Sequence, residues 1–328
     1  MTNLEASSNL YPIVVDRDVL TDSFRDDVLN GLARQSKRVP AKHLYDARGS
    51  ELFDAICEVR DYYPTRVERS IRETYAEEIA DAIGPDAAVI EPGAGTGEKA
   101  ESLLATLDSP RAFVPIEISE SALDVAARRV AGRFPDTEVL PICADFTRDR
   151  DLPETLGEDR RVVFFPGSTI GNLERNDRLD LLSAFASQAR DGGRLLIGFD
   201  LEKDERVLRN AYNDREGVTA EFNLNLLRRI NREIDGTFDL QAFTHDAPWV
   251  EERKRIEMHL VSLRDQTVCV DGSAFEFRAG ERIHTENSHK FSPDAFDAES
   301  LKAGFTPVER WTDEREWFCV ALYETRAE

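Results

Sequence analysis

The sequence predicts an α/β fold in which helices cover both faces of a largely parallel β-sheet. Between residues 67 and 200, five short apolar segments alternate with stretches of helical periodicity. The apolar segments lack an alternation of polar and apolar residues, which is the pattern of strands buried on both faces. Ligands bind at the carboxyl ends of the strands in sheets of this kind. We therefore expect the functional residues to follow the strands directly.

Each element of this sheet is placed by its own pattern. Val67, Ile71, Tyr75 and Ile79 recur at four-residue steps, which predicts an amphipathic helix. Ser119 is a residue type that caps helices, and it precedes another helical stretch. The expected order is a helix at 65–83, a strand at 88–91, a helix at 98–107, a strand at 112–118, a helix at 121–134, strands at 138–144 and 161–167, a helix at 176–190 and a strand at 194–200.

The pattern changes after Leu201 into a block that does not repeat the strand-helix unit. Asp271-Gly272 lies between two alternating runs and is a strong signal for a β-hairpin. We expect a helical stretch at 203–233 that is interrupted at Gly217, followed by strands at 255–263, 266–270 and 275–286. This block predicts a second, α+β region.

The last part of the chain returns to the first pattern. A helix is expected at 293–303, and strands at 305–311 and 317–324 would form an antiparallel hairpin. A parallel sheet that ends in such a hairpin is typical of Rossmann-like methyltransferases that use S-adenosylmethionine (SAM). We predict that residues 67–200 and 291–328 form the methyltransferase core, and that residues 1–66 and 201–290 form a substrate-binding domain.

The composition excludes several classes of function. The 42 lysine and arginine residues and 64 aspartate and glutamate residues give a net charge of −22, which disfavours nucleic acid and anionic membranes as partners. The longest run without charge, residues 162–173, is too short to cross a bilayer, and the first residues lack the pattern of a signal peptide. The cysteines and histidines show neither metal-binding spacing nor a disulfide framework. We expect a cytoplasmic protein without a metal.

A glycine cluster follows the first strand, with Gly93, Gly95 and Gly97 at the turn into a helix. Glycines there let the backbone approach a nucleotide, and the helix N-terminus offers free N–H groups. Glu117 at the end of the second strand is placed to bind ribose hydroxyls. Asp145 at the end of the third strand could accept a hydrogen bond from an adenine amino group. A nicotinamide cofactor and SAM are both compatible with this pattern.

Two further features bear on the chemistry. Lys99, just inside the helix after the glycines, could pair with the carboxylate of SAM, although a solvated surface lysine is the alternative. The segment Phe164–Asn172 ends the fourth strand with small residues and an asparagine. Methyltransferases that act on amines place there the group that meets the substrate nitrogen. A glycine-rich turn is the simpler interpretation of the segment.

A series of motifs, in order along the chain, resembles the histidine N-alpha-methyltransferases of ergothioneine biosynthesis. The motifs lie at residues 45–53, 61–66, 164–172, 211–233, 255–258 and 284–291. The resemblance implies an enzyme that uses SAM to methylate the α-amino group of L-histidine three times. The products are the betaine hercynine and S-adenosylhomocysteine. The substrate is a small molecule, and we expect a monomer.

The resemblance also implies roles for individual residues. Gly93, Gly95, Lys99, Glu117, Asp145 and Phe146 would hold SAM. Tyr62, Asn172 and Tyr212 would hold the carboxylate and amine of the amino acid, with Asn172 as the catalytic residue. Tyr45, Met258, Glu286 and Ser288 would line the imidazole pocket, and Gly167 and Thr219 match positions near the substrate. Glu117 and Asn287 depart from some members, which have Asp and Val there; we expect Asn287 to point away from the ligand.

The assignment is chemically coherent. A neutral imidazole has one donor and one acceptor nitrogen, so the Glu286 carboxylate could take the donor and the Tyr45 phenol could serve the other nitrogen. Three alternatives remain at this stage: a methyltransferase for another aromatic amino acid such as tryptophan, a SAM-binding module without turnover, and a nicotinamide oxidoreductase. The G-x-G-x-G spacing and the closing hairpin disfavour the oxidoreductase.

Overall fold

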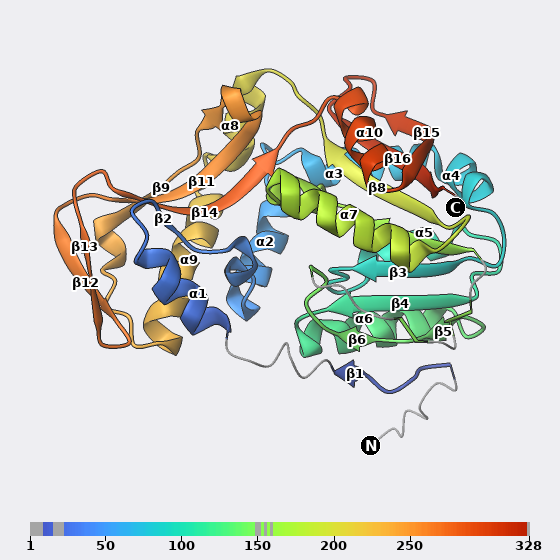
Figure 1. Cartoon of the computed structure of the whole chain (residues 1–328), viewed down its shortest axis with the longest axis horizontal. Helices are drawn as coiled ribbons and strands as arrows, with labels where there is room; N and C mark the ends of the chain where they lie inside the picture. Colours follow the sequence, from blue (N-terminus) through green and yellow to red (C-terminus); the bar gives the residue numbers. More distant parts are fainter. Residues whose placement is uncertain (1–8, 16–22, 148–151, 154–155, 158–159, 327–328) are drawn as a thin grey trace.

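Two β-sheets, side by side, organise the molecule (Figure 1). The computed structural model describes residues 9–15, 23–147, 152–153, 156–157 and 160–326. The first sheet has nine strands, and the order along its main path is β1-β6-β4-β3-β7-β8-β16-β15, with β5 paired to β4. The second sheet has five strands, in the order β10-β11-β14-β2 with β9 paired to β11.

The first sheet is parallel except at its end, where β16 runs antiparallel to β8 and to β15. Its strands are β1 (Val14–Val15), β3 (Ala88–Pro92), β4 (Ala112–Glu117), β5 (Glu138–Val139), β6 (Ile142–Cys143), β7 (Arg161–Phe165), β8 (Arg194–Asp200), β15 (Phe305–Thr312) and β16 (Phe318–Thr325). Every residue of β3 and of β7 is buried. The predicted α/β class with a closing hairpin is confirmed.

Helices cover both faces of this sheet, and each face has its own buried core. One core contains α3 (Pro64–Thr74), α4 (Ala76–Ile83), α5 (Glu98–Leu104) and α6 (Glu120–Arg133). The other contains α7 (Arg175–Ala189) and α10 (Pro293–Lys302). Ser119 caps α6 as expected, because its hydroxyl accepts a hydrogen bond from the backbone N–H of Ala122.

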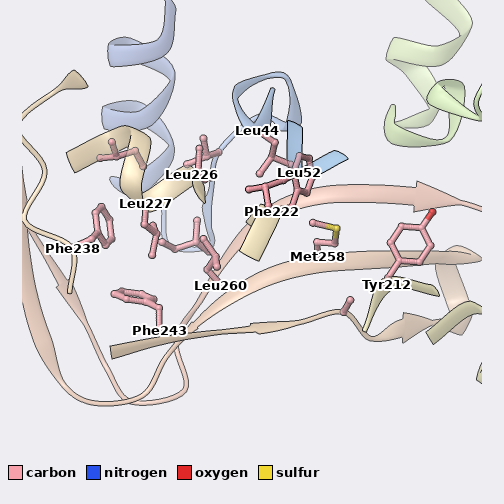
Figure 2. Close-up of a cluster of buried hydrophobic side chains, with 14 of the residues drawn as sticks. Leu44, Leu52, Tyr212, Phe222, Leu226, Leu227, Phe238, Phe243, Met258 and Leu260 are labelled. Carbon is pink, nitrogen blue, oxygen red and sulfur yellow. The ribbon is translucent and has the colours of Figure 1, made fainter. Parts of the chain in front are cut away.

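The second sheet packs with four helices into a separate core. Its strands are β2 (Lys37–Arg38), β9 (Phe243–Asp246), β10 (Trp249–Val250), β11 (Arg255–Ser262) and β14 (Arg282–His289). The helices are α1 (Ser23–Leu32), α2 (Ala47–Glu58), α8 (Glu205–Tyr212) and α9 (Val218–Glu233). Figure 2 shows part of the core, where Phe222 and Leu226 of α9 lie near Leu260 and Met258 of β11. A two-stranded ribbon, β12 (Gln266–Val270) and β13 (Ser273–Phe277), extends from it (Figure 1).

Three expected elements are interrupted in the structure. The helix at 65–83 is divided into α3 and α4 at Tyr75, whose φ of −108° and ψ of 23° are not helical. The strand at 138–144 is divided into β5 and β6, since Pro141 lies between them and has no N–H for a ladder. The run at 275–286 contains a turn in which the Glu281 N–H donates to the Arg278 carbonyl, so it forms two strands.

Residues 9–15 contact the first sheet. β1 pairs in parallel with β6, and the Asn9 amide donates to the carbonyl oxygens of Phe134 and Thr137. These residues fall within the range 1–66 that the predicted division assigns to the substrate-binding domain. Short polar anchors of this kind give no periodic pattern in a sequence. The division into two domains otherwise stays a prediction.

Gly198, in the middle of β8, occupies a position without room for a side chain. A Cβ atom there would collide with the buried Glu68 carboxylate and lie 3.0 Å from the Phe318 ring. We expect Gly198→Ala to lower the free energy of unfolding in urea by about 1–3 kcal/mol.

Gly132→Ala is the matched control, because Gly132 lies in α6 with nothing within 4 Å of its Cβ position. Alanine there should leave stability unchanged or raise it by about 0.5–1 kcal/mol. Equal effects of the two substitutions would contradict tight packing at Gly198.

Candidate active site

A cavity lies where the carboxyl ends of β7 and β8 face β14. The predicted substrate residues Tyr45, Tyr62, Gly167, Asn172, Tyr212, Glu286 and Ser288 all line it. They come from segments that are far apart in the chain, and both sheets contribute. The fold therefore brings together seven side chains or backbone positions that the sequence analysis singled out separately.

Two predicted substrate residues are not among those that line this cavity. Met258 is buried in the core of the second sheet (Figure 2), and it pairs with Glu286 across the β11–β14 ladder. Thr219 is buried in the first turn of α9, where its backbone N–H donates to Asp214 over 2.8 Å. Their contact with a substrate stays a prediction.

Five further residues line the cavity, namely Phe53, Pro64, Ser168, Thr169 and Asp200. All but Asp200 lie inside motifs that were used for the resemblance, but none was assigned a role. Asp200 ends β8 and so satisfies the expectation that functional residues follow strands. Its position at the carboxyl end of a predicted strand could have identified Asp200 as a candidate site residue.

Glu286 is the least satisfied acidic group of the cavity. Its side chain is buried, and its Oε2 has no hydrogen-bond partner among the residues that the structure describes. Burial raises the pKa of the Glu286 carboxyl to about 8. Burial raises the pKa of the Tyr45 phenol well above its ordinary value of 10, and the neighbouring Glu286 carboxylate raises it further. The pair can exchange hydrogen bonds with a polar ring.

Aromatic side chains pack against Tyr45 and Tyr62. The Tyr45 ring packs edge-on against Phe53 and Phe222, with ring centroids 5.5 and 5.4 Å apart. Tyr62 packs edge-on against Tyr212 at 6.0 Å. Edge-to-face pairs at these distances hold rings in fixed orientations. Four aromatic rings therefore line the cavity together with six polar or charged side chains.

The loop after β7 presents Asn172. The short helix η4 (Thr169–Asn172) begins after Ser168, which has a φ of 60°. His289 Nδ1 lies 2.8 Å from the Gly171 carbonyl oxygen, so this nitrogen carries the hydrogen and donates it. Burial lowers the pKa of His289 to about 4, which keeps the ring neutral. No described residue is hydrogen-bonded to the Asn172 amide, which is left for a ligand.

Asn287 faces away from the cavity, as expected. Its amide oxygen lies 2.8 Å from His284 Nε2, and its amide nitrogen donates to Glu174. Successive side chains of a strand point to opposite faces, so Glu286 and Ser288 share the cavity face while Asn287 lies on the other. Asn287 is accordingly not among the residues that line the cavity.

The glycine turn after β3 has the open backbone that a nucleotide needs. Gly93, Gly95 and Gly97 have φ values of 70°, 53° and 75°, which favour glycine. A Cβ atom on Gly93 would lie 3.2 Å from the Phe146 ring, whereas one on Gly95 would meet nothing within 4 Å. Glu117 Oε2 accepts the Gly95 N–H over 3.0 Å. The turn, Phe146 and Glu117 therefore form one wall.

Asp145 lies beyond this wall at the end of the β6 segment. Its Oδ1 accepts hydrogen bonds from the backbone N–H of Thr147 over 3.0 Å and from the Thr147 hydroxyl over 2.6 Å. Lys42 Nζ lies 3.9 Å from its other oxygen. These contacts fix the orientation of the carboxylate.

A buried carboxylate, Glu68, joins the glycine turn to the cavity. Glu68 is 1% exposed; its Oε2 accepts from Lys99 Nζ over 3.0 Å and its Oε1 from the Gly167 N–H over 2.7 Å. Burial disfavours its charge, but Lys99 and Arg72 outweigh burial and hold its pKa below the ordinary 4.5. Sequence analysis missed Glu68, because a polar residue next to Val67 in a helix looks like a solvated one. Lys99 is therefore not a free surface lysine.

Two negative findings apply to the part of the chain that the structure describes. No group of three or more His, Cys, Asp and Glu side chains could hold a metal ion there. None of its helices is both long and apolar enough to cross a membrane.

Known proteins resemble the chain over most of its length. A family model described as histidine-specific methyltransferase, SAM-dependent, matches residues 24–325. A histidine N-alpha-methyltransferase from Mycobacterium tuberculosis is 41% identical over 305 residues, which cover 92% of this chain and 94% of that protein. One from Mycolicibacterium smegmatis is 40% identical over 301 residues, covering 90% and 93%. Ergothioneine biosynthesis protein 1 from Neurospora crassa is 28% identical over 88% of this chain and 33% of that protein.

The match to the family model spans nearly all of the described residues and includes both sheets and the cavity between them. The chain belongs to the family of SAM-dependent, histidine-specific methyltransferases.

Proposed function

We propose that the protein transfers methyl groups from SAM to the α-amino nitrogen of L-histidine and forms hercynine in ergothioneine biosynthesis. The observation that carries the proposal is the buried Glu286 carboxyl, which has an unpaired oxygen next to Tyr45 in the cavity that also holds Asn172. A buried polar group without a partner needs one from the ligand. An imidazole ring supplies it.

The glycine turn and its neighbours fit SAM. Gly93, Gly95, Glu117, Asp145 and Phe146 would hold its adenosine part, and Lys99 would hold its carboxylate. SAM supplies, when bound, a methyl group on a positively charged sulfur, and S-adenosylhomocysteine is the product. The open backbone at Gly95 and the aromatic wall at Phe146 support this assignment.

The imidazole of L-histidine would lie between Glu286 and Tyr45. Glu286 accepts or shares the proton of one ring nitrogen, and Tyr45 serves the other. A site built on such bonds rejects analogues that leave its buried groups unpaired. Met258 of β11 lies opposite Glu286 of β14 and would support the pocket from there. Ser288 would form another part of the pocket wall.

The α-amine would meet Asn172, with Tyr62 and Tyr212 beside it and the backbone of Gly167 and the α9 residue Thr219 nearby. An α-amino group has a pKa of roughly 8, so a neutral fraction exists at working pH and orientation is the main requirement. Before each transfer the nitrogen loses a proton, because only a neutral amine has the lone pair that attacks the methyl group. Trimethylation ends the reaction, because the betaine nitrogen has no lone pair.

Two other functions are less well supported. A pocket for tryptophan or another aromatic amino acid would leave part of the Glu286–Tyr45 pair without a partner. A SAM-binding module without turnover would not need the aligned Asn172, Tyr212 and Glu286. We also propose that the protein acts as a monomer in the cytoplasm. The twelve described residues that line the cavity belong to one chain, which supports the monomer.

The purified protein, incubated with SAM and each common amino acid separately, should convert only L-histidine to its mono-, di- and trimethylated forms. Mass spectrometry of the amino acids and of S-adenosylhomocysteine measures this. Trimethylation of tryptophan without that of histidine would contradict the substrate, and cofactor binding without any product would contradict catalysis.

Asn172→Ala should lower kcat/KM for L-histidine about 100-fold, because the amine loses its alignment with the methyl group. Asn176→Ala is the matched control: Asn176 is exposed on α7, four residues along the chain. It should leave steady-state kinetics unchanged. Full activity of Asn172→Ala with an unchanged KM would refute the role of the amide.

Glu286→Gln should weaken histidine binding and yet stabilise the free protein. Glutamine cannot share a proton with a ring nitrogen as the carboxyl group can, so the Kd for L-histidine should rise about 10–100-fold in calorimetry. The folded pKa of about 8 exceeds the ordinary 4.5, so the wild type loses stability as pH rises between these values, and the glutamine variant avoids that loss. Its advantage in urea unfolding should grow by about 1–3 kcal/mol from pH 5 to pH 8.

Glu276→Gln on the exposed strand β13 is the control for this experiment. It should change neither histidine affinity nor the unfolding free energy by more than about 0.5 kcal/mol at either pH. A Glu286→Gln variant that binds histidine as tightly as the wild type would show that imidazole lies elsewhere.

A further inference from the structure

A buried lysine contacts three of the residues that line the cavity but has no part in the chemistry described above. Lys290 directly follows β14, and its side chain is 0% exposed. Its ammonium group donates to Asp200 Oδ2 over 2.7 Å, to Ser288 Oγ over 2.8 Å and to the Tyr212 hydroxyl over 3.0 Å. An ammonium has three donors, so all of them are used.

Asp200 anchors this lysine from the other sheet. Its carboxylate also accepts from the Tyr63 hydroxyl over 2.7 Å and from Lys203 Nζ over 2.5 Å. Burial opposes the charges of Asp200 and Lys290, but their mutual attraction outweighs it, which lowers the pKa of Asp200 and raises that of Lys290. Burial lowers the pKa of Lys203 to about 8. Lys290 is the lysine that donates to Ser288 and Tyr212, so its ammonium is the positive charge in contact with this hydroxyl pair.

The hydrogen bonds of Lys290 determine whether the Tyr212 and Ser288 hydroxyls can donate a hydrogen bond to a ligand. Both oxygens accept a hydrogen from Lys290, and they lie 2.6 Å from each other, so one hydroxyl donates to the other. One O–H remains, and both residues line the cavity. The pair therefore presents a donor with a positive charge behind it, which matches an anion and repels an ammonium group.

We propose that Lys290, held in place by Asp200, is the positioning residue through which the cavity selects substrates with an α-carboxylate. The inference rests on the proposed function, because the carboxylate is that of the amino-acid substrate. It also orients the substrate: with the carboxylate at Tyr212, the amine is left for Asn172 and the ring for Glu286.

The test compares L-histidine with L-histidinamide, which differs in lacking the carboxylate charge. Their Kd values are measured by calorimetry in the presence of S-adenosylhomocysteine. The wild type should bind L-histidine at least about tenfold more tightly, and Lys290→Met should reduce this ratio at least about tenfold. Ionisation of the ligands themselves cancels, because the same two ligands are compared in every variant.

Three further proteins complete the test. The Asp200→Asn/Lys290→Met double variant removes the opposite charge as well, and Tyr212→Phe removes only the hydroxyl through which Lys290 acts, so it keeps the fold; both should reduce the ratio. Lys302→Met, at an exposed position that ends α10, should leave it unchanged. Affinity for S-adenosylhomocysteine and the Tm report whether each variant is folded.

The outcomes separate the two proposals. An unchanged ratio in Tyr212→Phe or in a folded Lys290→Met variant would overturn the inference, as would a wild type that binds the two ligands equally well. A wild type that binds S-adenosylhomocysteine but neither ligand would overturn the proposed function, and the inference with it.

Discussion

The buried contact between Asp200 and Lys290 is the constraint on which the cavity depends. Asp200 is the last residue of β8 in the first sheet, and Lys290 directly follows β14 in the second. Their ion pair therefore links the two sheets. Backbone hydrogen bonds reinforce it, since Phe291 N–H donates to the Asp200 carbonyl over 2.9 Å. Charges are expensive to bury unless their hydrogen-bonding capacity is filled, and here Tyr63, Lys203, Ser288 and Tyr212 fill it. Apolar side chains could also hold the two sheets together. They would lack the directional hydrogen bonds that fix the positions of Ser288 and Glu286 relative to Asn172.

A second buried carboxylate connects the glycine turn with the substrate cavity. Glu68 holds Lys99 on the side of the glycine turn and the Gly167 N–H on the side of the substrate cavity. A single side chain thus contacts both parts of the site, and Gly198 lies against its carboxylate. Alignment of a methyl donor with an amine requires well-defined positions, since a displacement of about 1 Å can lower a rate about 100-fold.

The sequence predicted the elements with strong periodicity and missed those whose reason is a distant partner. The strand at 194–200 was placed correctly because seven residues in a row are suited to a buried strand. Glu68 was overlooked because its partner Lys99 lies 31 residues away, and helical spacing carries no sign of it. The pairing of β1 with β6 could not be foreseen for the same reason. Most of the site residues came from the family resemblance, whereas Asp200 and Lys290 become meaningful only when the two sheets are seen together.

The most direct test is a crystal structure of the protein with L-histidine and S-adenosylhomocysteine. We predict the imidazole ring between Glu286 and Tyr45, with a ring nitrogen at about 2.6–3.2 Å from a Glu286 oxygen. The carboxylate should contact the Tyr212 hydroxyl in front of Lys290, and the amine should contact the Asn172 amide and face the sulfur. A histidine bound in the reverse direction, with its carboxylate at Glu286 or its ring at Tyr212 and Lys290, would contradict the central claim that the buried Glu286 carboxyl and the Lys290 ammonium orient the substrate.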